Sequence, residues 1–245
     1  MDHFTKTTTK FIYIAFTATL LFLGCKKEDL TGTEWGERAV AKRNEITALG
    51  ANISCSQKDN VIIQALEQNC SVLYFTILKT DITKYEKLKK EYLELTGKQY
   101  AAWHREGLIV EPCYDAIWSV NQPVRLDCIN DKVKLVTASD IPVVEARALI
   151  ITTRQEINSL IATQTCTNEA NWSVTGLINE QTMTMDHITF SRNTDYKELK
   201  SKVSLYNRLN INIIDSEKKG SSFKNEKLVE KVECVNGKPV IKFKS

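Results

Sequence analysis

Cysteine is the residue type whose chemistry this sequence points to most directly. The chain has seven cysteines, and six of them lie beyond residue 50: Cys55, Cys70, Cys113, Cys128, Cys166 and Cys234. An even number of cysteines in an oxidising compartment predicts disulfides, although six cysteines allow 15 pairings. A spacing of about 15 residues separates Cys55 from Cys70 and, again, Cys113 from Cys128. We therefore expect the pairs Cys55–Cys70, Cys113–Cys128 and Cys166–Cys234.

Metal binding and catalysis fit the sequence less well. Structural zinc sites use closely spaced Cys-x2-4-Cys pairs, and the sequence contains none. Asp186 and His187 are neighbours on an expected strand, so their side chains should point to opposite faces. His104 lies near the end of an expected helix, where the helix dipole already favours a cation. The sequence also lacks a Gly-rich phosphate loop, HExxH and GxSxG. We expect no metal, no cofactor and no catalytic residue.

Two tryptophans are candidates for binding. Trp118-Ser119-Val120 follows Cys113, and Trp172-Ser173-Val174 follows Cys166 in the same way. Matching positions usually make matching core contacts, but exposed tryptophans also form platforms for ligands. Both interpretations of Trp118 and Trp172 remain open at this point.

Apolar stripes at helical spacing predict the helices that position these residues. The stripes are Trp35, Ala39, Ile46 and Leu49; Tyr85, Leu88, Tyr92 and Leu95; Ala146, Leu149, Thr153, Ile157 and Leu160; and Tyr196, Leu199, Val203 and Tyr206. The first helix should begin at Thr33 and end before Gly50, and Pro142 should lie in the first turn of the third.

Similar segments indicate an internal repeat. The residues 125–132 (RLDCINDK) resemble 231–238 (KVECVNGK), and each leads into an alternating apolar strand. Asn236-Gly237 is a strong hairpin turn. These patterns predict an α+β domain over 35–245, built from repeated helix plus antiparallel β-hairpin units held by disulfides. The units are 35–80, 81–137 and 138–245, the last with an extra helix. The alternative is chance similarity between short amphipathic segments.

The N-terminus has the pattern of an export signal. Lys6 and Lys10 precede an apolar run from Phe11 to Leu23, which ends at Gly24-Cys25. A positive start, a short apolar core and a small residue are typical of a secretory signal peptide. The run is shorter than the roughly 20 residues of a membrane-spanning helix.

Phe22-Leu23-Gly24-Cys25 resembles the lipobox of bacterial lipoproteins, with Phe22 where leucine is commonest. Such looser forms are typical of the Bacteroidota. The resemblance implies a signal peptide over 1–24, cleavage before Cys25, a diacylglyceryl group on its thiol and an acyl chain such as palmitate on its amine. Residues 25–29 (CKKED) resemble a tag that sends lipoproteins to the outer face of the outer membrane. Residues 25–34 would then be a lipidated tether. A plain secretory signal with a chance cysteine is the alternative.

Composition limits the classes of partner. The net charge is +3, from 33 basic and 30 acidic residues that are dispersed along the chain. This pattern argues against nucleic acid, because a binding face needs concentrated basic residues. We expect a lipoprotein anchored in the bacterial outer membrane, with a non-catalytic binding, adhesion or structural role toward a protein or glycan. The alternatives are an inhibitor or immunity-type lipoprotein, which blocks a toxin or hydrolase, and an envelope hydrolase with His187 or His104 as its base.

Overall fold

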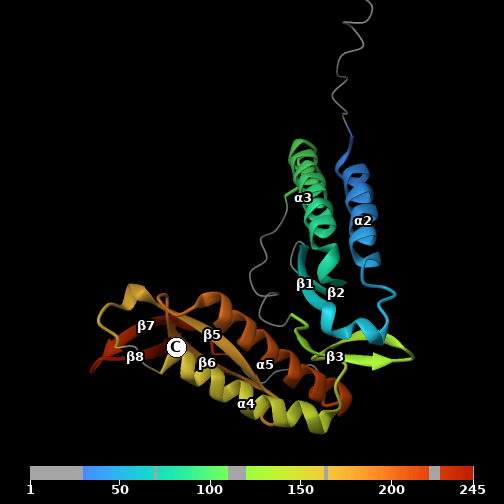
Figure 1. The fold of residues 1–245 in the computed structure, drawn as a ribbon. Coiled ribbons are helices and arrows are strands. Elements are labelled where there is room, and N and C mark those ends of the chain that lie inside the picture. Colours follow the sequence, from blue (N-terminus) through green and yellow to red (C-terminus); the bar gives the residue numbers. More distant parts are fainter. Residues whose placement is uncertain (1–29, 69–70, 110–119, 163–164, 221–226, 245) are drawn as a thin grey trace, which may run out of the picture. The chain divides into compact units, whose positions relative to one another are not determined.

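The computed structural model describes residues 30–68, 71–109, 120–162, 165–220 and 227–244 (Figure 1). Cys25 and the rest of the signal region, Cys70, Cys113 and Trp118 lie outside the described residues. The described chain forms two compact units. The first contains residues 30–42 and 90–109, and the second contains the remaining described residues.

Helices alternate with antiparallel hairpins throughout the described residues. The helices are α2 (Gly32–Ala48), α3 (Ile82–Arg105), α4 (Val143–Ile161) and α5 (Tyr196–Ser216). The hairpins pair β1 (Val61–Gln68) with β2 (Ser71–Leu78), β3 (Pro123–Ile129) with β4 (Lys132–Thr137), β5 (Trp172–Asn179) with β6 (Thr184–Ser191), and β7 (Val229–Val235) with β8 (Lys238–Phe243). Each hairpin is a separate two-stranded sheet.

The mixture of helices and antiparallel hairpins agrees with the expected α+β class. The chain from residue 138 onward differs from expectation, because it contains two helices that are each followed by a hairpin. The turn of the β5–β6 hairpin was missed because it has no Asn-Gly signal. Instead, the Asn179 side chain accepts hydrogen bonds from the backbone N–H groups of Gln181 and Thr182, at 3.1 and 3.2 Å. In the described parts of the chain, none of the helices has the length and apolar character needed to span a membrane.

Helix α2 begins at Gly32, one residue earlier than expected, and its capping residue is Thr31. The backbone N–H of Glu34 donates to the Thr31 hydroxyl at 3.3 Å, and the Glu34 carboxylate accepts from the backbone N–H of Thr31 at 2.8 Å. This reciprocal pair is a capping box, and it satisfies two backbone donors at the helix start.

In the first unit, the N-terminal part of α2 packs against the C-terminal part of α3. The Lys98 ammonium lies 4.7 Å from the ring centre of Trp35, which is itself buried. The backbone N–H of Gly32 donates to the Glu106 carboxylate at 2.7 Å. These contacts join the start of α2 to the end of α3, so the two segments run antiparallel.

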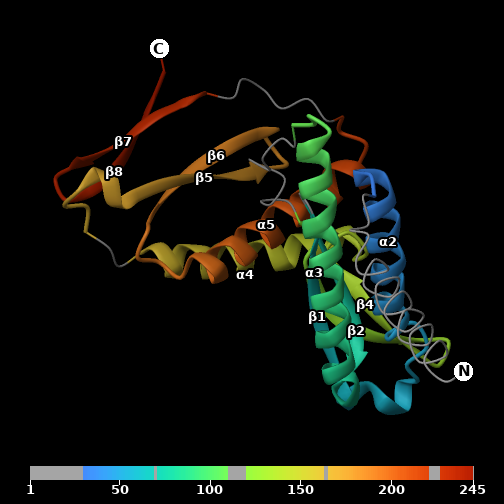
Figure 2. The same cartoon turned by 90° about the horizontal axis from the view of Figure 1, so that it is seen from above.

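The second unit contains a core cluster around α4, α5 and the β5–β6 hairpin. Helices α4 and α5 lie side by side along this hairpin (Figures 1 and 2). The buried members of the cluster are Ile157, Leu177, Phe190, Leu199, Val203 and Tyr206. Ile157, Leu177, Leu199 and Val203 are completely buried. The hydrophobic effect on these side chains holds helices and hairpin together.

A buried amide connects α5 to the free edge of β5. The Asn207 side chain accepts from the backbone N–H of Ile178 at 2.8 Å and donates to the carbonyl of Gly176 at 3.0 Å. Unpaired strand edges need a cover that satisfies their backbone groups. Asn207 satisfies these backbone groups here. Its role could not be predicted from the apolar stripe of α5, because Asn207 is polar.

The predicted stripes describe the buried helix faces well. Tyr85, Leu88 and Tyr92 of α3 are all buried, as are Leu199, Val203 and Tyr206 of α5. Tyr196 differs, since it is 51% exposed at the first position of α5. Tyr196 directly follows the capping residue Asp195, so it lies at the start of the helix, before α5 reaches the core.

Candidate functional site

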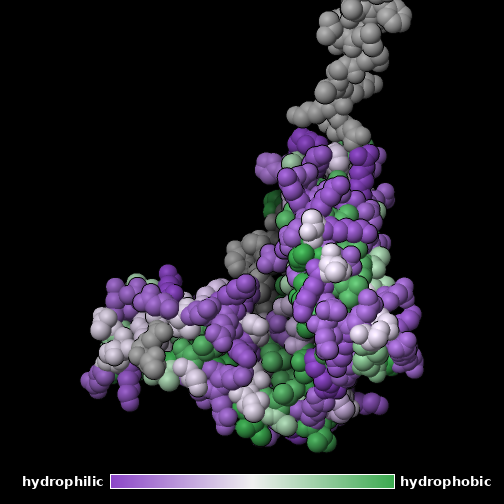
Figure 3. All heavy atoms as spheres, viewed as in Figure 1, coloured by the Kyte–Doolittle hydropathy of each residue, from purple (hydrophilic) through white to green (hydrophobic). Residues whose placement is uncertain are grey.

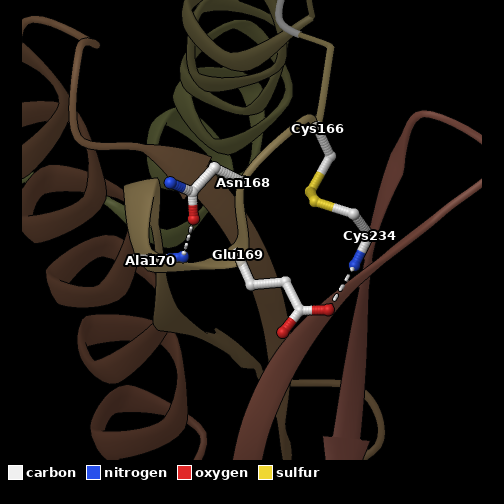
Figure 4. The surroundings of a disulfide bond; sticks show 5 residues. All are labelled: Cys166, Asn168, Glu169, Ala170 and Cys234. Carbon is white, nitrogen blue, oxygen red and sulfur yellow. Dashed lines mark hydrogen bonds between the residues drawn. A yellow bond between two sulfur atoms is a disulfide. The ribbon is translucent and has the colours of Figure 1, made fainter.

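Cys166 and Cys234 form a disulfide, which confirms the pair predicted from the sequence. Their Cα atoms are 5.3 Å apart and they are separated by 68 positions. Figure 4 shows the bond between the segment that precedes β5 and strand β7. Beside it, the Glu169 carboxylate accepts from the backbone N–H of Cys234 at 3.5 Å, and the Asn168 side chain accepts from Ala170 N at 3.0 Å.

The other two predicted cysteine pairs stay predictions, because Cys70 and Cys113 lie outside the described residues. Cys55 and Cys128 are free thiols. Cys55 begins a 3₁₀ turn (Cys55–Asn60), and its backbone N–H donates to the carbonyl of Asp131 at 3.1 Å, in the turn that follows Cys128. The backbone therefore joins the segment of Cys55 to the hairpin that contains Cys128.

Trp172 lies in the core. It is 7% exposed and begins β5. Its burial favours the core interpretation over a platform for ligands. Trp118, at the matching sequence position, lies outside the described residues.

The two candidate histidines have unremarkable surroundings. His187 packs edge-on against Phe243, with ring centres 5.5 Å apart. Asp186 is exposed and accepts from the Asn179 amide at 3.3 Å. His104 lies in the last turn of α3. Among the described residues, no group of three or more His, Cys, Asp and Glu side chains is arranged to hold a metal ion.

A cluster of charges that the sequence analysis missed surrounds one buried carboxylate. Glu180 follows β5 and is only 5% exposed. The Arg147 guanidinium of α4 and the Lys219 ammonium both donate to it. Glu217 completes the cluster, at 2.7 Å from Arg147 and 2.9 Å from Lys219. Two positive and two negative groups therefore neutralise one another.

The end of α5 directs Lys219 toward this cluster. Lys218 adopts a positive φ of 52°, and Gly220 one of 80°. The backbone N–H of Lys219 donates to the carbonyl of Ile214 at 3.1 Å, which closes the last turn. A left-handed residue after a helix reverses the chain and satisfies the terminal carbonyls. Here the reversal brings the ammonium group back to Glu180.

Hydrogen bonds within the cluster shift the pKa values of Glu217, Lys219 and Arg147. Hydrogen bonds from Lys219 and then from Arg147 lower the pKa of Glu217. Hydrogen bonds to Glu180 and then to Glu217 raise the pKa of Lys219. Those to Glu217 and Glu180 raise the pKa of Arg147. Each of these shifts moves a pKa further from neutrality.

An open cavity of about 370 Å³ lies beside the cluster. Its lining combines apolar, aromatic, amide and charged side chains from α4, α5 and the β5–β6 turn: Arg147, Ile150, Ile151, Asn179, Glu180, Gln181, Tyr206 and Asn210. Ile151 is 62% exposed, so an apolar side chain stands in solvent at its margin. Figure 3 shows one face of the molecule as largely hydrophilic, with hydrophobic side chains exposed among the hydrophilic ones. A cavity with this mixed lining can contact both polar and apolar parts of a ligand.

No protein-family model, curated protein or solved structure matches the chain.

The cavity could not have been found from local sequence patterns. Arg147, Glu180 and Lys219 come from three different elements, and no motif relates their spacing. The one available signal was Glu180 itself, since a charged residue directly after a buried strand often needs a partner.

Proposed function

We propose that this chain is an exported lipoprotein, anchored in the bacterial outer membrane through acyl groups on Cys25, and that its folded part binds a protein or glycan without catalysis. The lipobox-like segment ending at Cys25 and the lysine-plus-acidic residues after it support the anchor. The Cys166–Cys234 disulfide is consistent with export, because disulfides persist in oxidising compartments. The resemblance of residues 25–29 to an export tag supports a location on the outer face of that membrane.

One observation carries the binding role: the charged side chains beside the cavity are paired with one another through hydrogen bonds. A general acid or base works best when its pKa lies near the operating pH. The pKa of Glu217 is lowered and those of Arg147 and Lys219 are raised. Groups in this state orient a ligand through fixed charges and do not exchange protons with it. The cavity therefore favours recognition.

The helix–hairpin units are, in this proposal, related copies. The order of a helix followed by a hairpin supports this, since it recurs along the described chain. Adjacent hairpins and helices would then present similar surfaces several times along the chain. A preorganised scaffold suits binding, because less conformational freedom is lost when the partner docks.

Replacing Cys25 tests the anchor. In a bacterium that processes lipoproteins, we expect Cys25→Ser to abolish palmitate labelling and to leave the chain outside the outer-membrane fraction. A serine hydroxyl does not replace the thiol as acyl acceptor, and stable anchoring needs two or more chains, at about 0.8 kcal/mol per buried CH2. Gly24→Ala is the matched control, because it keeps a small residue before the cut and should be labelled normally. Normal labelling of Cys25→Ser, or a mature N-terminus elsewhere, would contradict the anchor.

Site-specific crosslinking tests the cavity. A photoreactive residue at position 151 should form adducts with an envelope protein or glycan in intact cells. The same residue at position 93 should form several-fold fewer, although Leu93 is also exposed, at 50%. Gln181→Trp adds bulk to the lining of the cavity and should reduce the yield at position 151. Equal yields from both positions, or a yield that Gln181→Trp leaves unchanged, would exclude the cavity as the binding site.

A further inference from the structure

The backbone brings Cys55 and Cys128 to the same end of one hairpin. The backbone N–H of Val133 donates to the carbonyl of Ile53 at 2.8 Å, and Ser54 forms a bridge with Lys132. Residues 53–55 therefore lie along the free edge of β4. On the other side of β4, Cys128 of β3 is the partner of Val133. Cys55 thus begins the 3₁₀ turn next to the free edge of β4, and Cys128 lies on β3, both close to the β3–β4 turn.

A hydrogen bond with the Cys128 thiol is the main reason, and burial the second, that the pKa of the Cys55 thiol is raised to about 11. Cys128 is exposed and Cys55 is partly buried. An external reagent can therefore reach the sulfur of Cys128 directly.

The same backbone arrangement surrounds the disulfide between Cys166 and Cys234. The backbone N–H of Cys166 donates to the carbonyl of Gly237 at 2.9 Å, as that of Cys55 donates to Asp131. Gly237 lies three residues after Cys234, and Asp131 lies three residues after Cys128. Each bond thus joins the first cysteine to the turn that follows the second.

The two hairpins that hold the second cysteines match in detail. Both turns have two residues with positive φ: 52° and 59° at Asn130-Asp131, and 52° and 74° at Asn236-Gly237. Both pairs of strands also show a register shift near the start of the first strand, between Pro123 and Arg125 and between Val229 and Lys231. The similarity of residues 125–132 to 231–238 therefore extends to their backbone.

The correspondence extends along the chain at an offset of roughly 110 positions. It relates α2 to α4, β1–β2 to β5–β6, α3 to α5, and β3–β4 to β7–β8. Core positions agree with it, since Ile46 and Ile157 are completely buried, as are Leu66 and Leu177. At this offset, Cys55 corresponds to Cys166, and Cys128 to Cys234. Both positions of the Cys166–Cys234 disulfide are therefore also cysteines in the first half of the chain, at Cys55 and Cys128.

We infer that Cys55 and Cys128 form a disulfide in the oxidised protein, as the counterpart of Cys166–Cys234. It would enclose β1–β2 and α3, as the second bond encloses β5–β6 and α5. The oxidant is a disulfide, either of a thiol oxidoreductase or of oxidised glutathione. The Cys128 thiolate attacks it and releases one thiol, and the Cys55 thiolate then displaces the second thiol from the mixed disulfide. Two S–H bonds of the protein and the S–S bond of the oxidant break and one S–S bond forms in the protein, while the two protons and two electrons pass to the two thiols that the oxidant releases.

A disulfide-linked peptide map tests this pairing. The full-length Cys25→Ser chain is purified in reduced form, oxidised in a glutathione redox buffer, blocked with N-ethylmaleimide and digested with trypsin. Lys58 separates Cys55 from Cys70, and Arg125 separates Cys113 from Cys128, so the four cysteines fall in different peptides. We expect a linked Cys55–Cys128 species that disappears on reduction. In Cys128→Ser, this species should be lost while Cys166–Cys234 remains, which reports a folded chain.

Two results would overturn the inference. One is a linked species that joins Cys55 to Cys70 or Cys113 to Cys128. The other is complete labelling of Cys55 and Cys128 by N-ethylmaleimide in a chain that has formed Cys166–Cys234. The oxidant is supplied in vitro and position 25 cannot be acylated. Neither result therefore depends on export or lipidation, and both would leave the proposed function standing.

Discussion

Replacing Cys166 and Cys234 together by alanine is expected to lower the free energy of unfolding by about 4 kcal/mol, because the bond closes a long loop in the unfolded chain. The two residues are separated by 68 positions and lie 5.3 Å apart between Cα atoms. Cys166 is also buried, at 3% exposure, so its replacement removes core contacts as well. Urea denaturation without reductant measures the change.

A comparison with reductant separates the bond from the side chains. The wild-type chain should lose stability when dithiothreitol is added, and the double variant should lose much less. If the double variant unfolds at the same urea concentration as the wild type, the bond contributes nothing to stability. If dithiothreitol destabilises both chains equally, the loss arises from another disulfide.

Ile157→Ala is expected to cost about 3 kcal/mol, within the 2–5 kcal/mol range for a large-to-small change in a core. Ile157 is completely buried on α4, where it packs in the cluster with Leu177 and Leu199. Truncation leaves a cavity between the helices and the β5–β6 hairpin. Chemical denaturation should show a lower midpoint with an unchanged slope.

Ile151→Ala is the matched control on the same helix. Ile151 is 62% exposed, so its truncation should change stability by no more than about 0.5 kcal/mol. Similar losses from the two variants would mean that α4 does not bury the face that contains Ile157. A large loss from Ile151→Ala alone would have the same meaning.

Features that depend on neighbouring residues were predictable from the sequence. The burial of Tyr85, Leu88 and Tyr92 follows from helical spacing alone, because residues three and four apart share one face. The turn at Asn236-Gly237 follows from the tolerance of both residue types for positive φ, and both adopt it. The start of α2 shows the limit of such reasoning, since two threonines compete as the cap and only Thr31 is followed at the right distance by Glu34.

Features that depend on distant segments were decided only by the tertiary structure. The segment of Cys55 pairs with the β3–β4 hairpin, which follows α3 and contains Cys128. Spacing along the sequence does not by itself bring two cysteines together, because a disulfide needs Cα atoms less than about 7 Å apart. The burial of Glu180 between Arg147 and Lys219 likewise required three elements to meet. Local sequence determined which residues form helices and turns, whereas packing of those elements determined which side chains meet.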